Sequence, residues 1–375
     1  MPALMHVPAA DLRGQHDPLR AELMAAFGRV LDSSAFIQGP EVEAFEREFA
    51  VFCGVRHAVT VSNGTDALAL ALRALDIGAG DAVALPAFTF AATAEVVCHV
   101  GARPLLVDID PRSFTLDPEA LRRALRQRTG RVRAIIAVHL YGQPAAMNEI
   151  TAVADEAGVA VIEDAAQAHG ARCGGRRAGG LGRAGCFSFY PSKNLGALGD
   201  AGAVTTDDAG VAARVALLRD HGQTGKYVHS VVGFNCRMDG VQAAVLRVKL
   251  RHLEWWNARR QALAARYRRA LADVSAIALP ETGANREHVY HLFVVRCRER
   301  DALRRYLNEC DIAAGVHYPA PIHFQPAFAF LGHRAGDFPA AEAAAREVLA
   351  LPLYPELADE EAAAVCEAVR AWARQ

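Results

Sequence analysis

Between residues 57 and 206, short apolar runs alternate with longer amphipathic stretches. Residues 57–62 and 82–85 have the composition of buried strands, whereas residues 65–74 and 117–126 show helical spacing of their apolar side chains. Strands that alternate with helical patterns of about 10–15 residues indicate βαβ units, which build a mainly parallel sheet covered by helices. The same pattern predicts a helix over 90–100 and further strands over 104–108, 134–140, 159–163, 186–189 and 203–206.

The pattern changes after residue 240 or so. Residues 239–272 predict a long helix, in one piece or two, and the segments beyond it predict a strand over 289–295, a helix over 300–310, a strand over 315–318 and a final helix from Asp359. We therefore expect an α/β fold in two domains. The large domain would span residues 1–245, N-terminal segment included, and residues 246–375 would form a smaller C-terminal α+β domain.

Charge and cysteine usage exclude several classes of protein. The chain has 41 Lys and Arg residues against 42 Asp and Glu residues, whereas binding to nucleic acid or to an anionic membrane needs a basic face. No apolar run approaches the ~18 residues of a membrane span, and residues 1–17 do not resemble a signal peptide. The eight cysteines are scattered, without a CxxC pair or paired Cys/His spacing. We therefore expect reduced thiols, a cytoplasmic protein and no metal site.

Residues with useful chemistry follow the expected strands. Ligands of open parallel sheets bind at the carboxyl ends of the strands, so these residues are expected to meet at one edge of the sheet. They are Asn63, Gly64, Thr65 and Asp66 after the first strand, Thr89 and Phe90 after the second, Asp164 and Gln167 after residues 159–163, Ser188 within 186–189, and Tyr190 and Lys193 just beyond it.

The types of these residues match what pyridoxal phosphate (PLP) requires. Gly64 at a helix start allows backbone N–H groups to approach a phosphate. Asp164 can pair with a protonated ring nitrogen, and Phe90 can lie flat on a heteroaromatic ring. Lys193, one of only three lysines, can form a Schiff base with an aldehyde. Each residue also has an ordinary structural interpretation, and only the combination in this order favours the cofactor.

Two other patterns are rejected. Residues 180–185 (GLGRAG) match GxGxxG, but a dinucleotide-binding loop follows a strand and opens a helix. Here a polar stretch precedes the motif and a strand follows it, so we expect a flexible loop. His317 and His323 lack helical i, i+4 spacing and a Cys or carboxylate partner, which argues against a metal site.

Taken together, seven stretches resemble the DegT-type sugar aminotransferases, PLP-dependent transferases of fold type I with the aspartate-aminotransferase fold. They are 39–42 (GPEV), 61–68 (VSNGTDAL), 138–142 (VHLYG), 162–170 (IEDAAQAHG), 187–196 (FSFYPSKNLG), 242–250 (QAAVLRVKL) and 317–319 (HYP). The resemblance extends from about residue 35 to 355, and the stretches around Asp164 and Lys193 are its specific signals. It implies a mostly parallel, seven-stranded type of sheet in the large domain.

The resemblance also implies roles for single residues. Lys193 would bond to the cofactor and move a proton between Cα and C4′, and Asp164 would bind the pyridine nitrogen. Further cofactor contacts would come from Gln167 near the phenolic oxygen, Phe90 on the ring, and Gly64, Thr65 and Ser188 at the phosphate. The family forms homodimers with active sites at the subunit interface, so the partner's Asn235 would reach the phosphate. Candidates for contacting substrate are Tyr190, Arg237, His317 and Tyr318.

The implied reaction is a two-step transamination. An amino acid, L-glutamate, would convert PLP to pyridoxamine phosphate, which would then aminate a keto carbon of a nucleotide-linked sugar. Residues 138–142 and 317–319 look most similar to members that act at C3 of dTDP-linked 6-deoxy-ketohexoses.

Other functions remain open at this point. One alternative is amination of a keto-cyclitol or of another sugar carbon. Another is PLP-dependent sugar dehydration, against which Lys193 argues because such relatives carry His at that position. A third is a non-catalytic PLP-binding regulator; a DNA-bound regulator would add a basic helix-turn-helix segment, and the sequence has none.

Overall fold

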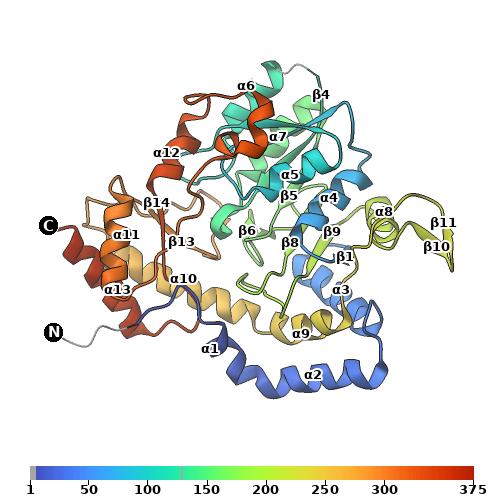
Figure 1. Cartoon of the computed structure of the whole chain (residues 1–375), viewed down its shortest axis with the longest axis horizontal. Coiled ribbons are helices and arrows are strands. Elements are labelled where there is room, and N and C mark those ends of the chain that lie inside the picture. The colour runs from blue at the N-terminus through green and yellow to red at the C-terminus, as the bar shows by residue number, and fades with distance from the viewer. Residues whose placement is uncertain (1–5, 128–129) are drawn as a thin grey trace.

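The computed structural model describes residues 6–127 and 130–375, and its centre is a seven-stranded sheet in the order β1-β9-β8-β5-β4-β2-β3 (Figure 1). β9 runs antiparallel to both of its neighbours, and the other neighbouring pairs are parallel. The expected α/β fold with a mostly parallel sheet is therefore confirmed. The strands are β1 (His57–Val61), β2 (Asp81–Pro86), β3 (Arg103–Val107), β4 (Arg131–Val138), β5 (Ala160–Asp164), β8 (Ala184–Ser188) and β9 (Gly202–Thr206).

Helices cover both faces of the sheet because its strands are apolar on both sides. Successive side chains of a strand point to opposite faces. Along β4, Ile136 and Val138 therefore pack with α4 (Gly64–Ala74), α5 (Ala92–His99) and α8 (Ala209–Arg219). Ile135 and Ala137 pack on the other face with α6 (Pro118–Gln127) and α7 (Met147–Ala157). The continuous apolar run of β4 thus fixes a three-layer arrangement.

The N-terminal segment forms helices that the strand-and-helix pattern did not predict. These are α1 (Leu12–His16), the 3-10 turn η1 (Asp17–Leu19), α2 (Arg20–Ser33) and α3 (Pro40–Cys53). The apolar side chains Leu23 and Val30 of α2 pack against Val245 and Val248 of α9 (Gly240–Leu250), and Figure 1 shows the two helices side by side.

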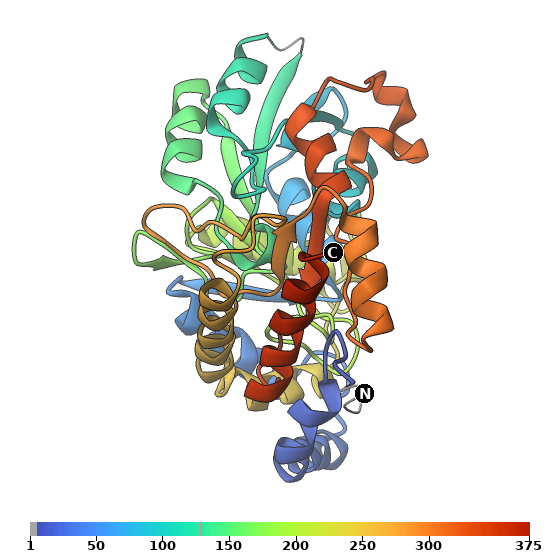
Figure 2. The same cartoon turned by 90° about the vertical axis from the view of Figure 1, so that its left-hand side faces the viewer.

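The C-terminal part packs around a short antiparallel pair, β13 (Phe293–Arg296) and β14 (Val348–Leu351). Figure 2 shows α13 (Asp359–Trp372, dark red) between α10 (Leu253–Ala270, gold) and α11 (Arg300–Glu309, orange). Val7 pairs with Ile312, so the first of the described residues also lie here. The proposed division between residues 245 and 246 stays a prediction, and it would fall inside α9.

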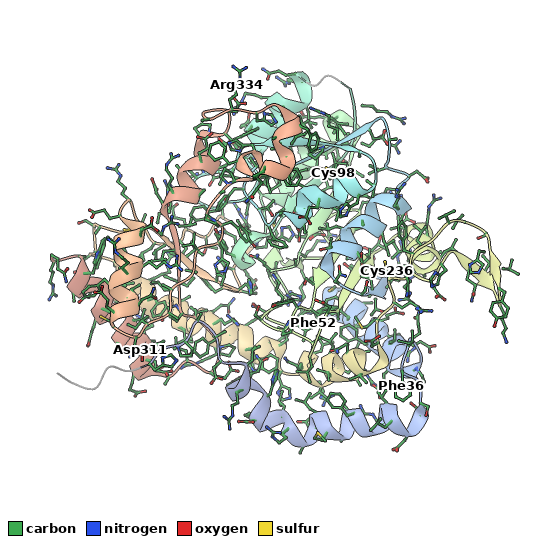
Figure 3. All side chains as sticks on the ribbon, viewed as in Figure 1. Phe36, Phe52, Cys98, Cys236, Asp311 and Arg334 are labelled. Atoms are coloured by element: carbon green, nitrogen blue, oxygen red, sulfur yellow. The ribbon has the colours of Figure 1, made fainter. Side chains whose placement is uncertain are left out.

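The remaining elements are short. β6 (Arg172–Cys173), β7 (Arg176–Arg177) and β12 (Arg286–Glu287) form one small sheet, and β10 (Gln223–Gly225) and β11 (Val228–His229) form a hairpin. The others are η2 (Leu140–Gly142), η3 (Ile322–Phe324), η4 (Pro326–Leu331) and α12 (Pro339–Glu347). Among the described residues, every helix is too short or too polar to cross a membrane. All eight cysteines are unpaired, and Figure 3 shows Cys98 and Cys236 in separate parts of the molecule.

Two expected elements near the C-terminus differ from the structure. The expected strand 315–318 is wrong, because only Gly315 forms an isolated bridge, to Ala350. The Tyr141 hydroxyl donates to the carbonyl of His317, and these long-range contacts hold the segment at a cavity instead of in a sheet. The expected strand 289–295 begins only at Phe293, because the N–H groups of Val289 and Leu292 donate to the carbonyls of Gly142 and Tyr141, and His291 and Leu292 line that cavity.

Candidate active site

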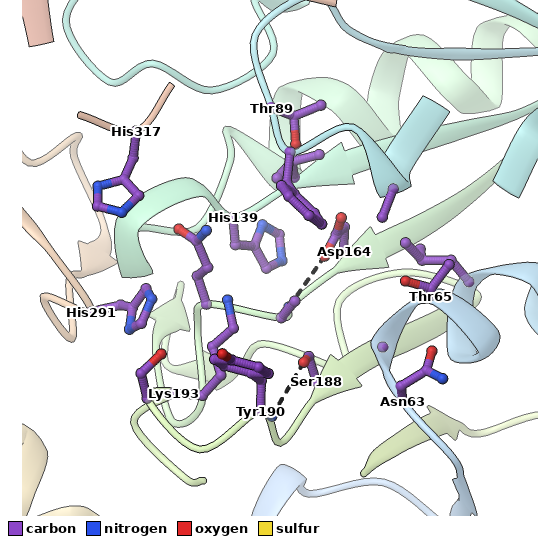
Figure 4. Close-up of a pocket in the computed structure, with 18 of the residues that line it drawn as sticks. Asn63, Thr65, Thr89, His139, Asp164, Ser188, Tyr190, Lys193, His291 and His317 are labelled. Carbon is purple, nitrogen blue, oxygen red and sulfur yellow. Dashed lines mark hydrogen bonds between the residues drawn. The ribbon is translucent and has the colours of Figure 1, made fainter. Parts of the chain in front are cut away.

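The carboxyl ends of β1, β2, β5 and β8 open into one cavity of about 570 Å³. Figure 4 shows labelled side chains from all four strand ends turned toward this space. The expectation that residues at the carboxyl ends of the strands meet at one edge of the sheet therefore predicted the place of this cavity. Of the predicted site residues, the cavity is lined by Gly64, Thr65, Phe90, Asp164, Gln167, Ser188, Tyr190, Lys193, His317 and Tyr318.

The N-terminus of α4 forms one wall of the cavity. The Asn63 side chain caps the helix by accepting the N–H of Asp66 at 2.8 Å. Among the described residues, the N–H groups of Gly64 and Thr65 have no partner. A Cβ on Gly64 would lie 2.6 Å from Cβ of Ser188, so only glycine allows this close approach of helix and strand. Free N–H groups at a helix start, in a space that glycine keeps open, fit a phosphate.

Asp164 ends β5 and is buried beside the cavity. Its carboxylate accepts a hydrogen bond from Thr93 Oγ1 at 2.9 Å and one from the Ala166 N–H at 3.2 Å. Burial raises the pKa of this carboxyl, while these two donors and the charge of Lys193 act against the rise. A cationic ring nitrogen at this position would restore the ionised form, so Asp164 fits the pyridinium of PLP.

Lys193 lies in the loop that follows β8, with its amine directed into the cavity (Figure 4). Desolvation lowers the pKa of Lys193 to about 8, and the negative charge of Asp164 opposes this effect. A lysine with a lowered pKa is present in part as the neutral amine, which is the nucleophilic and proton-accepting form. The amine and the carboxyl of Asp164 thus share one cavity, as covalent attachment of a ring aldehyde requires.

Gln167 and two aromatic rings, those of Phe90 and Tyr318, also line the cavity. Gln167 accepts the N–H of Tyr141 at 2.7 Å and donates to the Tyr318 hydroxyl at 3.2 Å, so its amide is held in one orientation. Phe90 is 57% exposed although it lines the cavity, and its ring centre lies 5.7 Å from that of Tyr318. A phenyl face left open at a cavity wall is available to a flat ring.

Two predicted site residues do not reach this cavity. Asn235 is exposed and pairs through its backbone with Asp220, at the base of the β10–β11 hairpin. Arg237 donates to the carboxylate of Asp220 at 3.0 Å. Within one copy of the chain, neither side chain lines the space that holds Lys193.

The sequence did not single out four residues that the structure places at or behind the site. His139 and His291 line the cavity, Thr93 binds Asp164, and Glu163 binds His139 Nε2 at 2.9 Å. His139 and Glu163 lie inside the quoted stretches 138–142 and 162–170, which was the available signal. Thr93 and His291 gave none, because their partners are 71 and 97 residues away.

Comparisons with known proteins cover nearly the whole chain. Residues 18–370 match the model of the DegT/DnrJ/EryC1/StrS aminotransferase family. The erythromycin biosynthesis sensory transduction protein EryC1 of Saccharopolyspora erythraea is 50% identical over 369 residues, which are 98% of this chain and 100% of that protein.

One further relative is an enzyme by name, and one solved structure is similar over nearly the whole chain. The dTDP-3-amino-3,4,6-trideoxy-alpha-D-glucose transaminase of Streptomyces venezuelae is 48% identical over 98% of this chain and 97% of its own. The crystal structure of S. venezuelae DesV in complex with a ketimine intermediate superposes with a TM-score of 0.96 at 48% identity, covering 99% of each chain.

Proposed function

The chain belongs to the DegT/DnrJ/EryC1/StrS aminotransferase family and is a PLP-dependent aminotransferase; from this premise we propose that it moves an amino group from L-glutamate to the C3 keto carbon of a dTDP-linked 6-deoxyhexose. One observation carries the proposal: the amine of Lys193 and the carboxyl of Asp164 line a single cavity whose wall is the glycine-started helix α4. The nucleotide sugar is supported by the name of the S. venezuelae transaminase.

The proposed roles follow from the contacts of each side chain. The N–H groups at the start of α4, together with Ser188, hold the phosphate. Asp164, fixed by Thr93, keeps the ring nitrogen protonated. When bound, PLP supplies a ring that accepts the electrons left by a broken Cα–H bond. Lys193 Nζ would take that proton from Cα of the amino donor and return it to C4′. A pKa of about 8 suits Lys193 to this transfer, because the amine can both accept and donate a proton near neutral pH.

The acceptor sugar would bind at the open side of the cavity. Tyr190, which is 54% exposed, and the pair His317 and Tyr318 border the space in front of Lys193. The carbonyl of His317 accepts a hydrogen bond from the buried Tyr141 hydroxyl, so this pair is held in place before substrate arrives. We propose that these three side chains contact the sugar, as the resemblance of residues 317–319 implies.

The proposal includes a homodimer with shared active sites. The β10–β11 hairpin projects from the body of the chain (Figure 1), and Tyr227 and Val232 near it are 81% and 94% exposed. Exposed apolar side chains that cluster on a projection are typical of an interface. Asn235 and Arg237 at its base would then enter the partner's cavity, which explains why they miss the cavity of their own chain. Light scattering should give twice the mass of the 40.2 kDa chain.

One relative favours a second candidate function. EryC1 of Saccharopolyspora erythraea is named a sensory transduction protein, and a regulator that keeps the fold would match that name. The catalytic set argues for the enzyme, because Lys193, Asp164, Gln167 and Ser188 are all present and all line the cavity. A cytoplasmic location belongs to the proposal as well, supported by eight unpaired cysteines.

The test combines a spectrum with product detection. Purified protein is incubated with L-glutamate and one acceptor at a time. The three acceptors are a dTDP-linked 3-keto-6-deoxyhexose, its 4-keto isomer and a keto-cyclitol, and the aminated product is detected by mass. We expect product from the 3-keto sugar, and loss of both the cofactor absorbance and turnover in Lys193→Ala. Arg334→Ala serves as the control, because Arg334 is an exposed cation outside the cavity and far from the β10–β11 hairpin (Figure 3). Turnover that persists in Lys193→Ala, or product from the cyclitol alone, would overturn the proposal.

A further inference from the structure

A buried chain of three side chains leads from the protein interior to His291 at the cavity wall. Asn257 of α10 donates through Nδ2 to the carbonyl of His169 at 2.8 Å. Asn194, the neighbour of Lys193, donates through Nδ2 to Asn257 Oδ1 at 2.9 Å and to the carbonyl of Val289 at 3.1 Å. Oδ1 of Asn194 lies 3.1 Å from Nδ1 of His291. All three side chains are buried.

The two backbone carbonyls fix the direction of every bond in this chain. A carbonyl oxygen only accepts, so the carbonyls of His169 and Val289 require the NH₂ groups of Asn257 and Asn194 to face them. Rotating either amide by 180° would bring two acceptors together in a buried position. Oδ1 of Asn194 must therefore point at His291, and because Oδ1 only accepts, Nδ1 of His291 carries the hydrogen.

A neutral imidazole with its hydrogen on Nδ1 has a lone pair on Nε2. Burial lowers the pKa of His291 well below its ordinary value, and the charges of Lys193 and Arg260 act in the same direction. The titratable groups that face this ring are Lys193 after β8, Arg260 of α10, His169 after β5 and His317 before η3. His291 therefore stays neutral, and its Nε2 is an acceptor without a hydrogen.

The ring is also fixed in position. The Arg260 guanidinium is buried and donates to the carbonyls of Tyr290, His291 and Leu353 at 3.2, 3.3 and 2.8 Å. Figure 4 shows His291 beside Lys193 on the same side of the cavity, and among the described residues its Nε2 has no hydrogen-bond partner. An oriented acceptor thus lies at the wall of the cavity that also holds the amine of Lys193.

We infer that His291 is a positioning residue for the reaction: its Nε2 accepts a hydrogen bond from the ammonium of Lys193 while that amine is detached from the cofactor. The bond holds the protonated amine in place until it delivers its proton, and no proton passes to the imidazole. The inference rests on the role proposed above for Lys193.

Two substitutions separate this role from a purely structural one. In His291→Asn, the new Nδ2 can still donate to Asn194, but the acceptor at the position of Nε2 is lost. In His291→Gln, the longer amide can present Oε1 at the position of Nε2, but the bond to Asn194 is lost. A positioning role predicts that Asn impairs turnover and Gln rescues it. A structural role predicts the opposite order, because Asn keeps the buried chain and Gln breaks it.

We expect kcat of His291→Asn to fall about tenfold to a hundredfold, the effect of one hydrogen bond to a charged group, with a urea midpoint close to that of the wild type. His291→Gln should keep kcat within about threefold of the wild type, although its urea midpoint falls. Equal kcat values for His291→Asn and wild type, or a larger loss in His291→Gln, would overturn the inference.

A second readout does not depend on turnover. The chain has three lysines, so ε-¹³C-lysine labelling gives three NMR signals, and Lys193→Ala identifies the one from Lys193. An acceptor stabilises the ammonium, so the pKa of Lys193 in the apoprotein should be about one unit lower in His291→Asn than in wild type and His291→Gln. An unchanged pKa would refute the positioning role even if Lys193→Ala is inactive, whereas turnover by Lys193→Ala would refute the proposed function instead.

Discussion

Replacing Glu163 by glutamine should destabilise the fold strongly. Glu163 is completely buried, and its carboxylate accepts four hydrogen bonds. Oε1 accepts the N–H groups of Leu181 and Gly182 at 2.7 and 2.8 Å. Oε2 accepts the N–H of Gly179 at 2.7 Å and Nε2 of His139 at 2.9 Å.

A glutamine at this position can satisfy only half of these donors. Whichever way the amide turns, its NH₂ group meets two donors. His139 cannot move its hydrogen to relieve the conflict, because its Nδ1 already accepts the N–H of Ala145 at 3.1 Å. Hydrogen bonds to charged groups are worth ~1.5–3 kcal/mol each, so losing two predicts a destabilisation of about 3–6 kcal/mol.

The assay is urea unfolding at one protein concentration, because the stability of the proposed homodimer would depend on concentration. Glu156→Gln is the matched control: the Glu156 side chain is 57% exposed and pairs with Arg122 at 3.3 Å. Exposed ion pairs contribute about 0–1 kcal/mol, so the control should stay near the wild type. If Glu163→Gln and Glu156→Gln unfold at the same urea concentration, the four-bond account of Glu163 is wrong.

Three further substitutions test other parts of the structure. Gly64→Ala places a Cβ 2.6 Å from Cβ of Ser188, and such overpacking costs about 1–3 kcal/mol. Cofactor binding should therefore weaken about five- to a hundredfold, as measured by titrating the apoprotein with PLP. Asp164→Asn removes the negative charge that pairs with the ring nitrogen, so kcat should fall at least about a hundredfold. PLP should still bind through its phosphate, and single-turnover kinetics measure the loss. His169→Phe should make stability less dependent on acid pH, as measured by urea midpoints at pH 7 and pH 5. Burial lowers the pKa of His169 from 6.5 to about 3, so between these two pH values the unfolded chain binds more protons than the folded chain. In the wild type this costs up to ~1.4 kcal/mol of stability for each unit by which the pH drops through that range, and the variant should lack this loss.

The sheet could be predicted because its strands carry their own signal. A strand buried on both faces, such as β4, must be apolar at successive positions, and the order of strand and helix then requires parallel pairing. The strand-end rule placed Gly64, Asp164 and Lys193 in one cavity without knowledge of any long-range contact. The strand expected at 315–318 failed because its conformation depends on contacts with Tyr141 and Gln167, far away in sequence.

The supporting contacts of the site could not be predicted for the same reason. Thr93 lies 71 residues from Asp164, and Asn194 lies 97 residues from His291. Which of many polar residues meets a given partner depends on register and helix rotation, which no local pattern specifies. Asn235 and Arg237 add a further difficulty, since the proposed sharing of the site between two copies would have no signature in the periodicity of one chain.

Glu163 and Asp164 show how adjacent acids can serve different ends. Because successive side chains of a strand point to opposite faces, Asp164 of β5 meets the cavity while Glu163 faces the other way and binds the 179–182 segment. This also explains the glycines around residue 180, whose N–H groups approach a buried carboxylate instead of a dinucleotide phosphate. Substitution of Glu163 should therefore lower stability, whereas substitution of Asp164 should lower activity. The Glu163→Gln variant, where it is folded, should still bind PLP. The Asp164→Asn variant should unfold near the wild-type urea midpoint.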